Sequence, residues 1–364
     1  MRALQEYAGL LKEDGPWCSI HADVSTGTVD TLEATDVLGD NISALLADAG
    51  ADRASVEAAG RLTWAAKGLP APVSRFVLVR GGEIVVNEVL PGAPAQPLVE
   101  VGPVPNLLPL AEHRAGDLVY LEVEAERADA EIRLHRASSP SPVAEQEVHG
   151  DTENLKKVPS GGWSQGRYQR RTEEVWRRNG ADVAKEVDRI VEAGGVDLVV
   201  LSGDERAQEK IRESLGDRAA GLVRTVAMNS SAPGADREKY QQQVELLVAE
   251  VSAARQARLL ERMAEGRGAR AAYGWGLTVR ALQEARVDTL VLCQEAAAER
   301  SVLALGGAPW VASTEAEAVG AGVLGQADPA AALLRAAVLT DADTILVPRG
   351  VLDSDEVAAL LRWE

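Results

Sequence analysis

The sequence has few of the residues that form disulfides and metal sites. Its two cysteines, Cys18 and Cys293, lie 275 positions apart in a chain of 364 residues, so no disulfide framework or Cys-x-x-Cys motif is predicted, and we interpret both as buried thiols. No HExxH or HxH pattern occurs, and no histidine pairs with a cysteine. The chain has four histidines: His21, His113, His135 and His149. We therefore expect no metal site and no cofactor.

Long apolar runs are also missing. The longest, residues 196–201 and 289–293, are far shorter than the roughly 20 residues that a membrane-spanning helix needs. The first residues include Glu6 and then Lys12, Glu13 and Asp14 before any long apolar stretch, which is unlike a secretory signal. These features predict a cytoplasmic protein with no membrane partner.

Positive charge is scarce. The chain has 38 basic and 56 acidic side chains and a net charge of -18, which argues against non-specific binding to nucleic acid or anionic lipid. Any contact with nucleic acid must therefore be local. The length predicts two or three domains with substantial cores.

The first part of the chain has the pattern of an α+β domain. Residues 75–80 and 83–90 are β-rich segments joined by Gly81-Gly82, a pair that tolerates the positive φ angles of a tight hairpin turn. Six prolines fall within residues 91–109, and we place the first linker there or just after it. The other elements predicted here are a strand at residues 17–24 and helices at 35–50 and 52–67.

Two further α/β units follow. The second has a hairpin (LVYLEV and AEIRLHR), a VDLVVL strand, an AGLVRTVA strand and a long helix over residues 237–262, which has no proline or glycine until Gly266. The third alternates helices and strands. Its predicted helices are residues 278–285, 329–339 and 354–363, and its predicted strands are residues 287–293, 309–312 and 344–348.

The most informative segment is residues 138–164, which show almost no apolar periodicity. Such long loops in compact domains are usually functional or disordered. The loop runs into KKVPSGGWSQGRYQRR, and a helix with two contrasting faces follows. At 100° per residue, Arg167 shares one face with basic residues, whereas the opposite positions are apolar. The basic positions are Arg171, Arg178, Lys185 and Arg189; the apolar ones are Tyr168, Val175, Trp176, Val183, Val187 and Ile190.

Residues 155–178 have a net positive charge, opposite to that of the whole chain, because they contain seven basic and two acidic side chains. Arginine donates paired hydrogen bonds to phosphate and stacks on bases, so one interpretation is a loop and helix that contact RNA. The alternative is a solvated helix face whose arginines pair with Glu173, Glu174 and Asp182. A phosphate-binding nucleotide loop is set aside because no GxxxxGK[ST] motif occurs.

This segment resembles the archaeal and eukaryotic class I release factor and Pelota family, and more closely its bacterial branch of Balon-like ribosome hibernation factors of the actinobacterial type. Release factors carry a Gly-Gly-Gln tip followed by a basic helix; here Gly161-Gly162-Trp163-Ser164-Gln165 is followed by GRYQRR. The domain order is also similar. The resemblance implies an α/β protein of three domains: residues 1–112, an N-terminal α+β decoding-centre domain; residues 116–260, a ribonuclease H-like middle domain with a long Gly-Gly loop; and residues 266–364, a C-terminal α/β domain like the kink-turn-binding ribosomal proteins.

By resemblance, the partners are the 70S ribosome, through rRNA of the decoding centre and the peptidyl transferase centre, and elongation factor Tu or a related GTPase. Residues 261–364 carry 9 basic and 15 acidic side chains, which suits a protein partner better than RNA. Off the ribosome we expect a monomer. The predicted RNA-binding residues are Lys156, Lys157, Gly161, Gly162, Trp163, Ser164, Gln165, Arg167, Arg170, Arg171, Arg177 and Arg178.

The sequence departs from the family at one chemical position. Peptide release needs the glutamine directly after the two glycines, and here that position is Trp163. We therefore predict a non-catalytic factor that occupies the A site of idle or stalled ribosomes during dormancy or stress. The alternative is a release or rescue factor that hydrolyses peptidyl-tRNA through the Gly-Gly tip with Gln165.

A third hypothesis is a nuclease, because the middle domain of the family resembles ribonuclease H. Metal-dependent nucleases need clustered carboxylates, and Asp117, Asp197 and Asp204 are candidates by residue type. The simpler interpretation is that Asp117 and Asp197 begin strands and that Asp204 caps a helix. The chain also has scattered tryptophans, interpreted as core residues: Trp17, Trp64, Trp275, Trp310 and Trp363.

Overall fold

The chain forms two compact units in the computed structural model. One unit is Asp117–Ala257, and the other combines Arg2–Gly116 with Arg258–Glu364. The fold is mixed α/β, as predicted, while the division into three domains stays a prediction. The structure describes residues 4–25, 37–66, 72–94, 96–114, 118–126, 129–137, 142–149, 165–228, 236–293, 300–352 and 356–363, without the side chains of residues 165–172.

The N-terminal part of the discontinuous unit is an antiparallel sheet of order β3-β2-β1-β4. The predicted hairpin is confirmed, because β2 and β3 meet at Gly81 and Gly82, whose φ angles are +54° and +82°. Part of the linker prediction is wrong: residues 98–102 of the proline-rich stretch form β4, because their backbone pairs with β1. The strands are β1 (Trp17–Asp23), β2 (Val73–Arg80), β3 (Glu83–Pro91) and β4 (Leu98–Gly102).

Helices cover one face of this sheet. The two predicted helices are present but shorter, as α2 (Leu38–Asp48) and α3 (Arg53–Gly60). Asp52 sets the start of α3, because its side chain accepts a hydrogen bond from the Ser55 backbone N–H. The apolar side chains of both helices pack on β1 and β2 in one core cluster.

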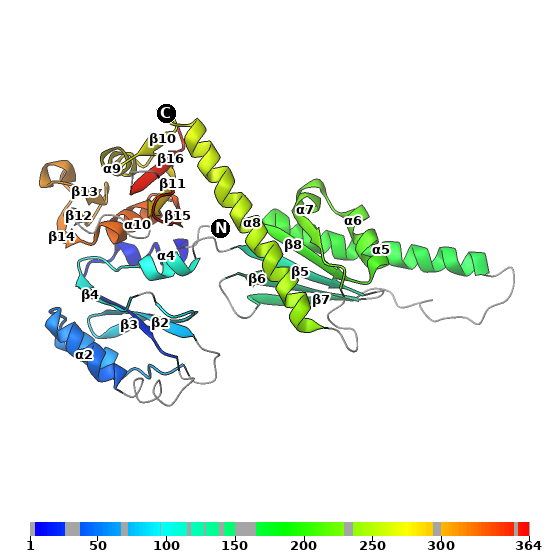
Figure 1. Ribbon diagram of the computed structural model, residues 1–364, viewed down its shortest axis with the longest axis horizontal. Helices are drawn as coiled ribbons and strands as arrows, with labels where there is room; N and C mark the ends of the chain where they lie inside the picture. The colour runs from blue at the N-terminus through cyan, green and yellow to red at the C-terminus, as the bar shows by residue number, and fades with distance from the viewer. Residues whose placement is uncertain are drawn as a thin grey trace. The chain divides into compact units, whose positions relative to one another are not determined.

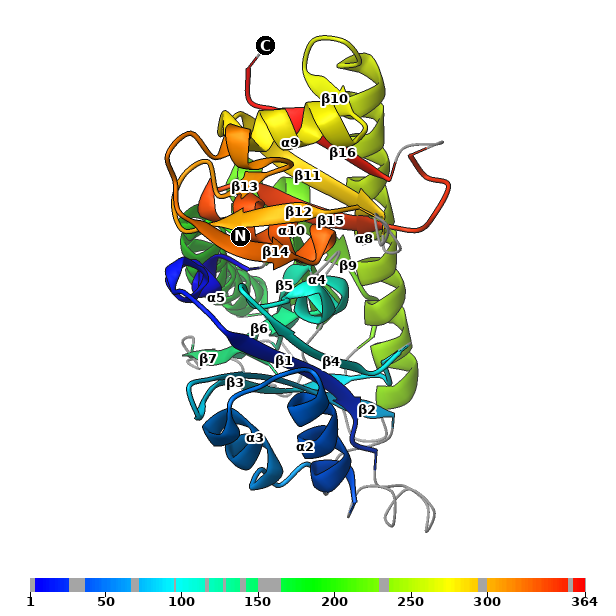
Figure 2. The same ribbon diagram turned by 90° about the vertical axis from the view of Figure 1, so that its left-hand side faces the viewer.

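The opposite sheet face packs on the C-terminal segment. Trp17, Phe76 and Leu78 belong to the same hydrophobic cluster as Leu333 and Leu290, and α4 (Leu108–Arg114) lies between the two parts (Figure 2). The predicted burial of Trp17 and Trp64 is confirmed; Trp275 and Trp310 are partly buried, and Trp363 is half exposed, contrary to the prediction. The two segments therefore share one core.

Arg335 joins these segments at their centre. Arg335 is 1% exposed, and its guanidinium donates hydrogen bonds to the carbonyl oxygens of Leu11 at 2.8 Å, Leu305 at 2.9 Å and Trp310 at 3.3 Å. Burial lowers its pKa to about 10. The N-terminal segment, with the short 3-10 helices Gln5–Tyr7 and Leu10–Lys12, is thereby attached to α10 (Pro329–Leu339).

The C-terminal segment contains a mixed sheet of order β10-β16-β11-β15. The predicted last helix, residues 354–363, is wrong: Val357–Leu361 is the strand β16, paired with both β10 and β11. Its alanines and leucines favour a helix, but two neighbouring strands supply backbone partners. The other elements are β10 (Ala271–Tyr273), α9 (Trp275–Gln283), β11 (Val287–Cys293) and β15 (Asp343–Val347).

A small antiparallel sheet of order β13-β12-β14 completes this segment. Its strand β13 (Val311–Ala312) falls within the predicted strand at residues 309–312. The strands β12 (Val302–Leu305) and β14 (Val323–Ala327) were not predicted. Both are short, with the sequences VLAL and VLGQA, and segments of four or five residues give little periodic signal.

The other unit has a five-stranded sheet of order β7-β6-β5-β8-β9. The predicted hairpin is confirmed as β5 and β6, and β8 and β9 continue the sheet in parallel. The predicted structureless loop is partly wrong, because residues 144–149 form the exposed edge strand β7, paired with β6. The strands are β5 (Val119–Ala125), β6 (Asp129–Arg136), β7 (Ala144–His149), β8 (Leu198–Gly203) and β9 (Val223–Thr225).

Helices cover both faces of this sheet (Figure 1). Leu121, Val123 and Ala125 of β5 point to one face and pack with α5 (Gln165–Ala193) and α6 (Glu205–Ser214). Tyr120 points to the other face, in a cluster with Tyr240 and Val244 of α8 (Arg237–Glu265). The short helix α7 (Asp217–Leu222) leads into β9.

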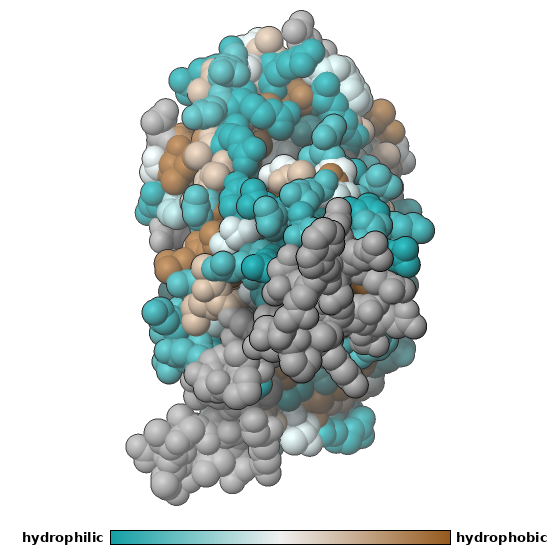
Figure 3. All heavy atoms as spheres, turned by 90° about the vertical axis from the view of Figure 1, so that its right-hand side faces the viewer, coloured by the Kyte–Doolittle hydropathy of each residue, from teal (hydrophilic) through white to brown (hydrophobic). Residues whose placement is uncertain are grey.

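The described surface is largely polar. Figure 3 shows hydrophilic residues over most of the described part of one face. None of the helices in the part of the chain that the structure describes combines the length and apolarity needed to cross a membrane. Cys18 and Cys293 are free and buried, as predicted.

Candidate nucleic-acid interface

The predicted RNA-binding residues fall in and before helix α5. Of these, Lys156, Lys157, Gly161, Gly162, Trp163 and Ser164 lie outside the described residues. Gln165, the glutamine of the release hypothesis, is the first residue of α5, and Arg167, Arg170 and Arg171 follow in its first two turns. The structure describes the side chains of Arg177 and Arg178, and both are exposed.

The C-terminal half of α5 anchors the helix to the sheet. Val183, Val187 and Val191 are each at most 5% exposed and pack against β5, β6 and β8. Lys185 and Arg189 lie on the exposed face. The predicted division into an apolar face and a basic face is therefore confirmed for the described side chains.

The N-terminal half of α5 extends past the strands. A helix of 29 residues is about 44 Å long, whereas β5, with seven residues, spans only about 24 Å. Within the described side chains of α5, Asn179 is the first that is buried. The 14 residues from Gln165 to Arg178 correspond to about 21 Å of helix, and they carry five of the predicted contact arginines.

Gly180 fixes how closely α5 approaches α6. A Cβ atom at this position would lie 2.8 Å from Cβ of Lys210 and 2.9 Å from its carbonyl carbon. The missing side chain lets the backbones come together, so the mid-helix glycine has a packing function. One turn earlier, the Arg206 guanidinium lies 5.4 Å from the centre of the Trp176 ring. The root of the projecting segment is thus held on α6.

Two arginines of the exposed face pair within the helix. Arg177 donates to Glu174 at 2.6 Å and Arg189 donates to Glu186 at 2.5 Å. The hydrogen bond from Arg177 lowers the pKa of Glu174. The Arg177 and Glu174 side chains are 61% and 53% exposed, and such exposed pairs contribute little to stability. Separating Arg177 from Glu174 therefore costs little free energy.

The carboxylates of the nuclease hypothesis have structural partners. Asp204 is the N-cap of α6 and accepts hydrogen bonds from the backbone N–H groups of Arg206 and Ala207. Asp197 accepts from Val119 N–H at 3.3 Å and pairs with Arg255 at 3.1 Å. Asp117 lies outside the described residues. Across the described ranges, no group of three or more His, Cys, Asp or Glu side chains is arranged to hold a metal ion.

A buried polar network lies on the other sheet face, beneath α8, and was not predicted. The Tyr240 hydroxyl donates to Oε1 of Glu122 at 2.7 Å and lies 3.2 Å from the Ser202 hydroxyl. Nε2 of His135 lies 2.9 Å from Oε2 of Glu122, and Arg133 lies 3.5 Å from the same carboxylate. Glu122 is only 8% exposed.

The network controls the ionisation of its members. Burial alone raises the pKa of Glu122, but hydrogen bonds with His135 and Tyr240 and the positive charge of Arg133 lower it below its ordinary value. Burial and the neighbouring carboxylate raise the pKa of Tyr240. The sequence does indicate that one face of β5 is polar, because Tyr120, Glu122 and Glu124 alternate with apolar residues along the strand. That Tyr240 of α8, more than 100 positions away, is a partner of Glu122 could not be predicted from the sequence around β5.

Comparison with known proteins identifies relatives for much of the chain. Residues 119–269 match the family described as bacterial archaeo-eukaryotic release factor family 2. The uncharacterized proteins Rv2629 and MT2704 of Mycobacterium tuberculosis, strains H37Rv and CDC 1551, are each 24% identical over 290 residues, which is 78% of this chain and 76% of theirs.

Two solved structures are similar to the chain at low sequence identity. Archaeal translation termination factor aRF1 is 15% identical, with coverage of 100% of this chain and 99% of its own and a TM-score of 0.29. Dom34 of Saccharomyces cerevisiae, a translation termination-like factor that interacts with Hbs1, is 11% identical over 80% of this chain and 79% of its own, with a TM-score of 0.42.

Proposed function

We propose that this chain, a bacterial homologue of the archaeal and eukaryotic release factor and Pelota family, is a ribosome-associated translation factor that occupies the A site of idle or stalled ribosomes. The projecting half of α5 and the Gly161-Gly162 segment before it are the part that contacts large-subunit RNA. In this proposal the protein acts in the cytoplasm, without membrane contact, and is a monomer off the ribosome.

One observation carries this proposal. The chain has a net charge of -18, yet five arginines lie on the first 14 residues of α5, roughly 21 Å of helix, ahead of Asn179, the first buried residue among the described side chains of this helix. An acidic body keeps non-specific RNA binding low, and a local basic projection restores affinity at one place. That combination suits a protein that inserts one segment into a site surrounded by RNA.

Trp163 is the reason for proposing that the factor does not catalyse peptide release. The glutamine that supports peptide release in the family is replaced by tryptophan, and Gln165 is already the first residue of α5. An indole stacks on exposed bases, which favours occupation over hydrolysis. A release assay on stalled peptidyl-tRNA complexes distinguishes the roles: peptide release that depends on Gln165 would support the rescue alternative and contradict ours.

The C-terminal segment is proposed to contact elongation factor Tu or a related GTPase. Its acidic balance, 9 basic and 15 acidic side chains in residues 261–364, repels RNA and leaves a protein surface as the suitable partner. Binding of the purified GTPase, with GDP or a GTP analogue, to the purified chain of 364 residues tests this part separately from ribosome binding.

Cosedimentation with 70S ribosomes tests the main proposal. The double variant Arg167→Glu and Arg171→Glu is expected to lose most binding at physiological salt, because each reversal turns a phosphate contact into repulsion. The matched control is Lys185→Glu with Arg189→Glu, which makes the same charge change on the anchored half of α5, where both side chains are exposed. Equal binding by both variants would contradict the proposal.

A further inference from the structure

A second group of arginines lies where α8 ends and the chain turns into β10. Residues 258–270 carry four arginines and two glutamates, whereas residues 271–364 carry six arginines and 13 acidic side chains. Three of the first group form what we call the turn patch: Arg262, Arg267 and Arg270. All three are exposed. The C-terminal segment, acidic as a whole, is therefore basic at this turn.

The backbone holds the turn patch together. The carbonyl of Gly266 accepts hydrogen bonds from the N–H groups of Arg270 and Ala271, both at 2.8 Å. A Cβ atom on Gly266 would lie 3.1 Å from the carbonyl oxygen of Arg262 and 3.3 Å from Cβ of Arg270, so the missing side chain lets the end of α8 approach Arg270. Met263, 1% exposed, packs this end of α8 on the sheet β10-β16-β11-β15. The arginines therefore extend from a turn that is fixed in place.

The turn patch has no internal counter-charge. Among the residues that the structure describes, no carboxylate pairs with its three arginines, although Glu265 is only three positions from Arg262. The six arginines of residues 271–364, by contrast, all interact with other groups of the protein: Arg280, Arg286, Arg300, Arg335, Arg349 and Arg362. The charge of the turn patch is thus available to an external anion.

An aromatic ring orients one arginine of the patch. The guanidinium carbon of Arg267 lies 4.5 Å from the centre of the Tyr273 ring on β10. This contact restricts the planar side chain and leaves its N–H groups for hydrogen bonds. The next residue is Gly268, and nothing lies within 4 Å of the point where its Cβ would be. A planar donor beside an open backbone suits a phosphate, which accepts paired hydrogen bonds from arginine.

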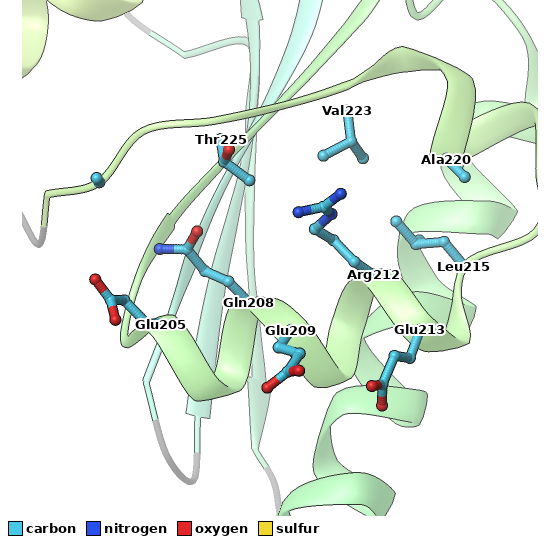
Figure 4. A pocket seen from close by; sticks show the side chains of 10 residues that line it. Glu205, Gln208, Glu209, Arg212, Glu213, Leu215, Ala220, Val223 and Thr225 are labelled. Atoms are coloured by element: carbon cyan, nitrogen blue, oxygen red, sulfur yellow. The ribbon is translucent and has the colours of Figure 1, made fainter.

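The pocket between α6 and β9, in the unit Asp117–Ala257, lacks this combination. Its volume is about 540 Å³, and Figure 4 shows Arg212 of α6 pointing into it. Three glutamates lie on the same helix: Glu205, Glu209 and Glu213. An RNA strand over this single arginine would meet their carboxylates, which repel phosphate. Arg212 is therefore a suitable control for the turn patch.

We propose that the turn patch binds the phosphate backbone of RNA. Arg267 holds one phosphate through paired N–H groups, and Arg262 and Arg270 contact neighbouring phosphates. Arginine without lysine, with one guanidinium stacked on tyrosine, favours RNA over an acidic protein, for which positive charge alone would be enough. That the RNA is ribosomal rests on the proposed function, whereas RNA binding by the patch does not.

Fluorescence anisotropy with a fluorescein-labelled RNA duplex of about 20 base pairs tests the proposal without ribosomes. The reference is the purified chain with Arg167→Glu and Arg171→Glu, which lacks the α5 contact. We expect it to bind the duplex at about 0.1 M salt. Addition of Arg267→Glu and Arg270→Glu should weaken binding at least about tenfold and reduce the slope of log K against log salt by about 2.

The matched control adds Arg212→Glu and Arg218→Glu to the same reference. It makes the same charge change at two exposed arginines and should alter the affinity by less than about threefold, because salt screens distant charges. Equal affinities of the patch variant and this control, or no binding by the reference, would overturn the proposal. Displacement of the duplex by an octapeptide of glutamate as effectively as by unlabelled RNA would also overturn it and indicate an acidic protein partner.

The result is separable from the main proposal. Cosedimentation with 70S ribosomes decides whether the protein is ribosome-associated, and the anisotropy experiment contains no ribosome. Loss of the ribosomal role would therefore leave the measured difference between the patch variant and its control unchanged.

Discussion

Two helices of 29 residues, α5 and α8, pack on opposite faces of one sheet, and different interactions hold them there. The anchored half of α5 is held by valines in an apolar cluster. The first turns of α8 are held by apolar contacts and by the hydroxyl of Tyr240 on the buried Glu122 carboxylate. Apolar contact tolerates small shifts, whereas the polar network requires one geometry. The difference predicts that α8 is the more precisely placed and the more pH-sensitive helix.

The largest expected effect is the loss of the carboxylate beneath α8. Glu122→Ala leaves Tyr240, His135 and part of the charge of Arg133 without a buried partner, so the free energy of unfolding should fall by about 3 kcal/mol. Urea denaturation measures it. The matched control is Glu131→Ala, which removes a more exposed partner of Arg133 and should cost less. A larger loss in the control would show that Glu122 does not hold α8.

A smaller effect is expected for the apolar attachment of α5. Val187→Ala removes two methyl groups at a position that is 1% exposed and should lower the free energy of unfolding by about 2 kcal/mol. Lys185→Ala, on the exposed face of the same helix, should change it by less than about 0.5 kcal/mol. Equal losses would mean that α5 has no distinct buried face.

The smallest effect is a difference in acid sensitivity. Because the folded protein holds the pKa of Glu122 below its ordinary value of 4.5, this carboxylate stabilises the fold fully above that value, and the contribution is lost as the pH falls through the lowered pKa. Glu122→Gln should therefore flatten the decline in unfolding free energy from pH 6 to pH 3. Measurement in 0.5 M salt screens exposed pairs such as Glu174–Arg177, and parallel curves for both proteins would contradict the assignment.

Sequence patterns correctly predicted the helices and strands whose own residues include turn, cap or strand-forming types. The Gly81-Gly82 hairpin, the helix Pro329–Leu339 and the strand Val287–Cys293 have turn residues, caps or β-branched runs within their own sequence. Val357–Leu361 does not, because its Ala-Leu composition is typical of helices and only pairing with β10 and β11 makes it a strand. The sequence also did not predict edge strand β7. All but one of its six residues are exposed, so it lacks the alternation of apolar and polar residues that marks a half-buried strand.

The candidate site shows the same division. The two faces of α5 follow from a period of 3.6 residues and were predictable. The close approach of α5 and α6 at Gly180, and the meeting of Glu122 with Tyr240, depend on which elements become neighbours in space. Periodicity carries no information about such contacts between residues far apart in the sequence.

The shared core of the discontinuous unit has a consequence for synthesis. Trp17, Phe76 and Leu78 belong to a cluster completed by residues beyond position 280, the last of which is Leu361. During translation the apolar face of the sheet β3-β2-β1-β4 thus remains exposed to solvent while more than 200 further residues are synthesised. We expect this face to need protection by a chaperone until β16 leaves the exit tunnel, so that folding of the nascent chain depends on the cell's folding machinery.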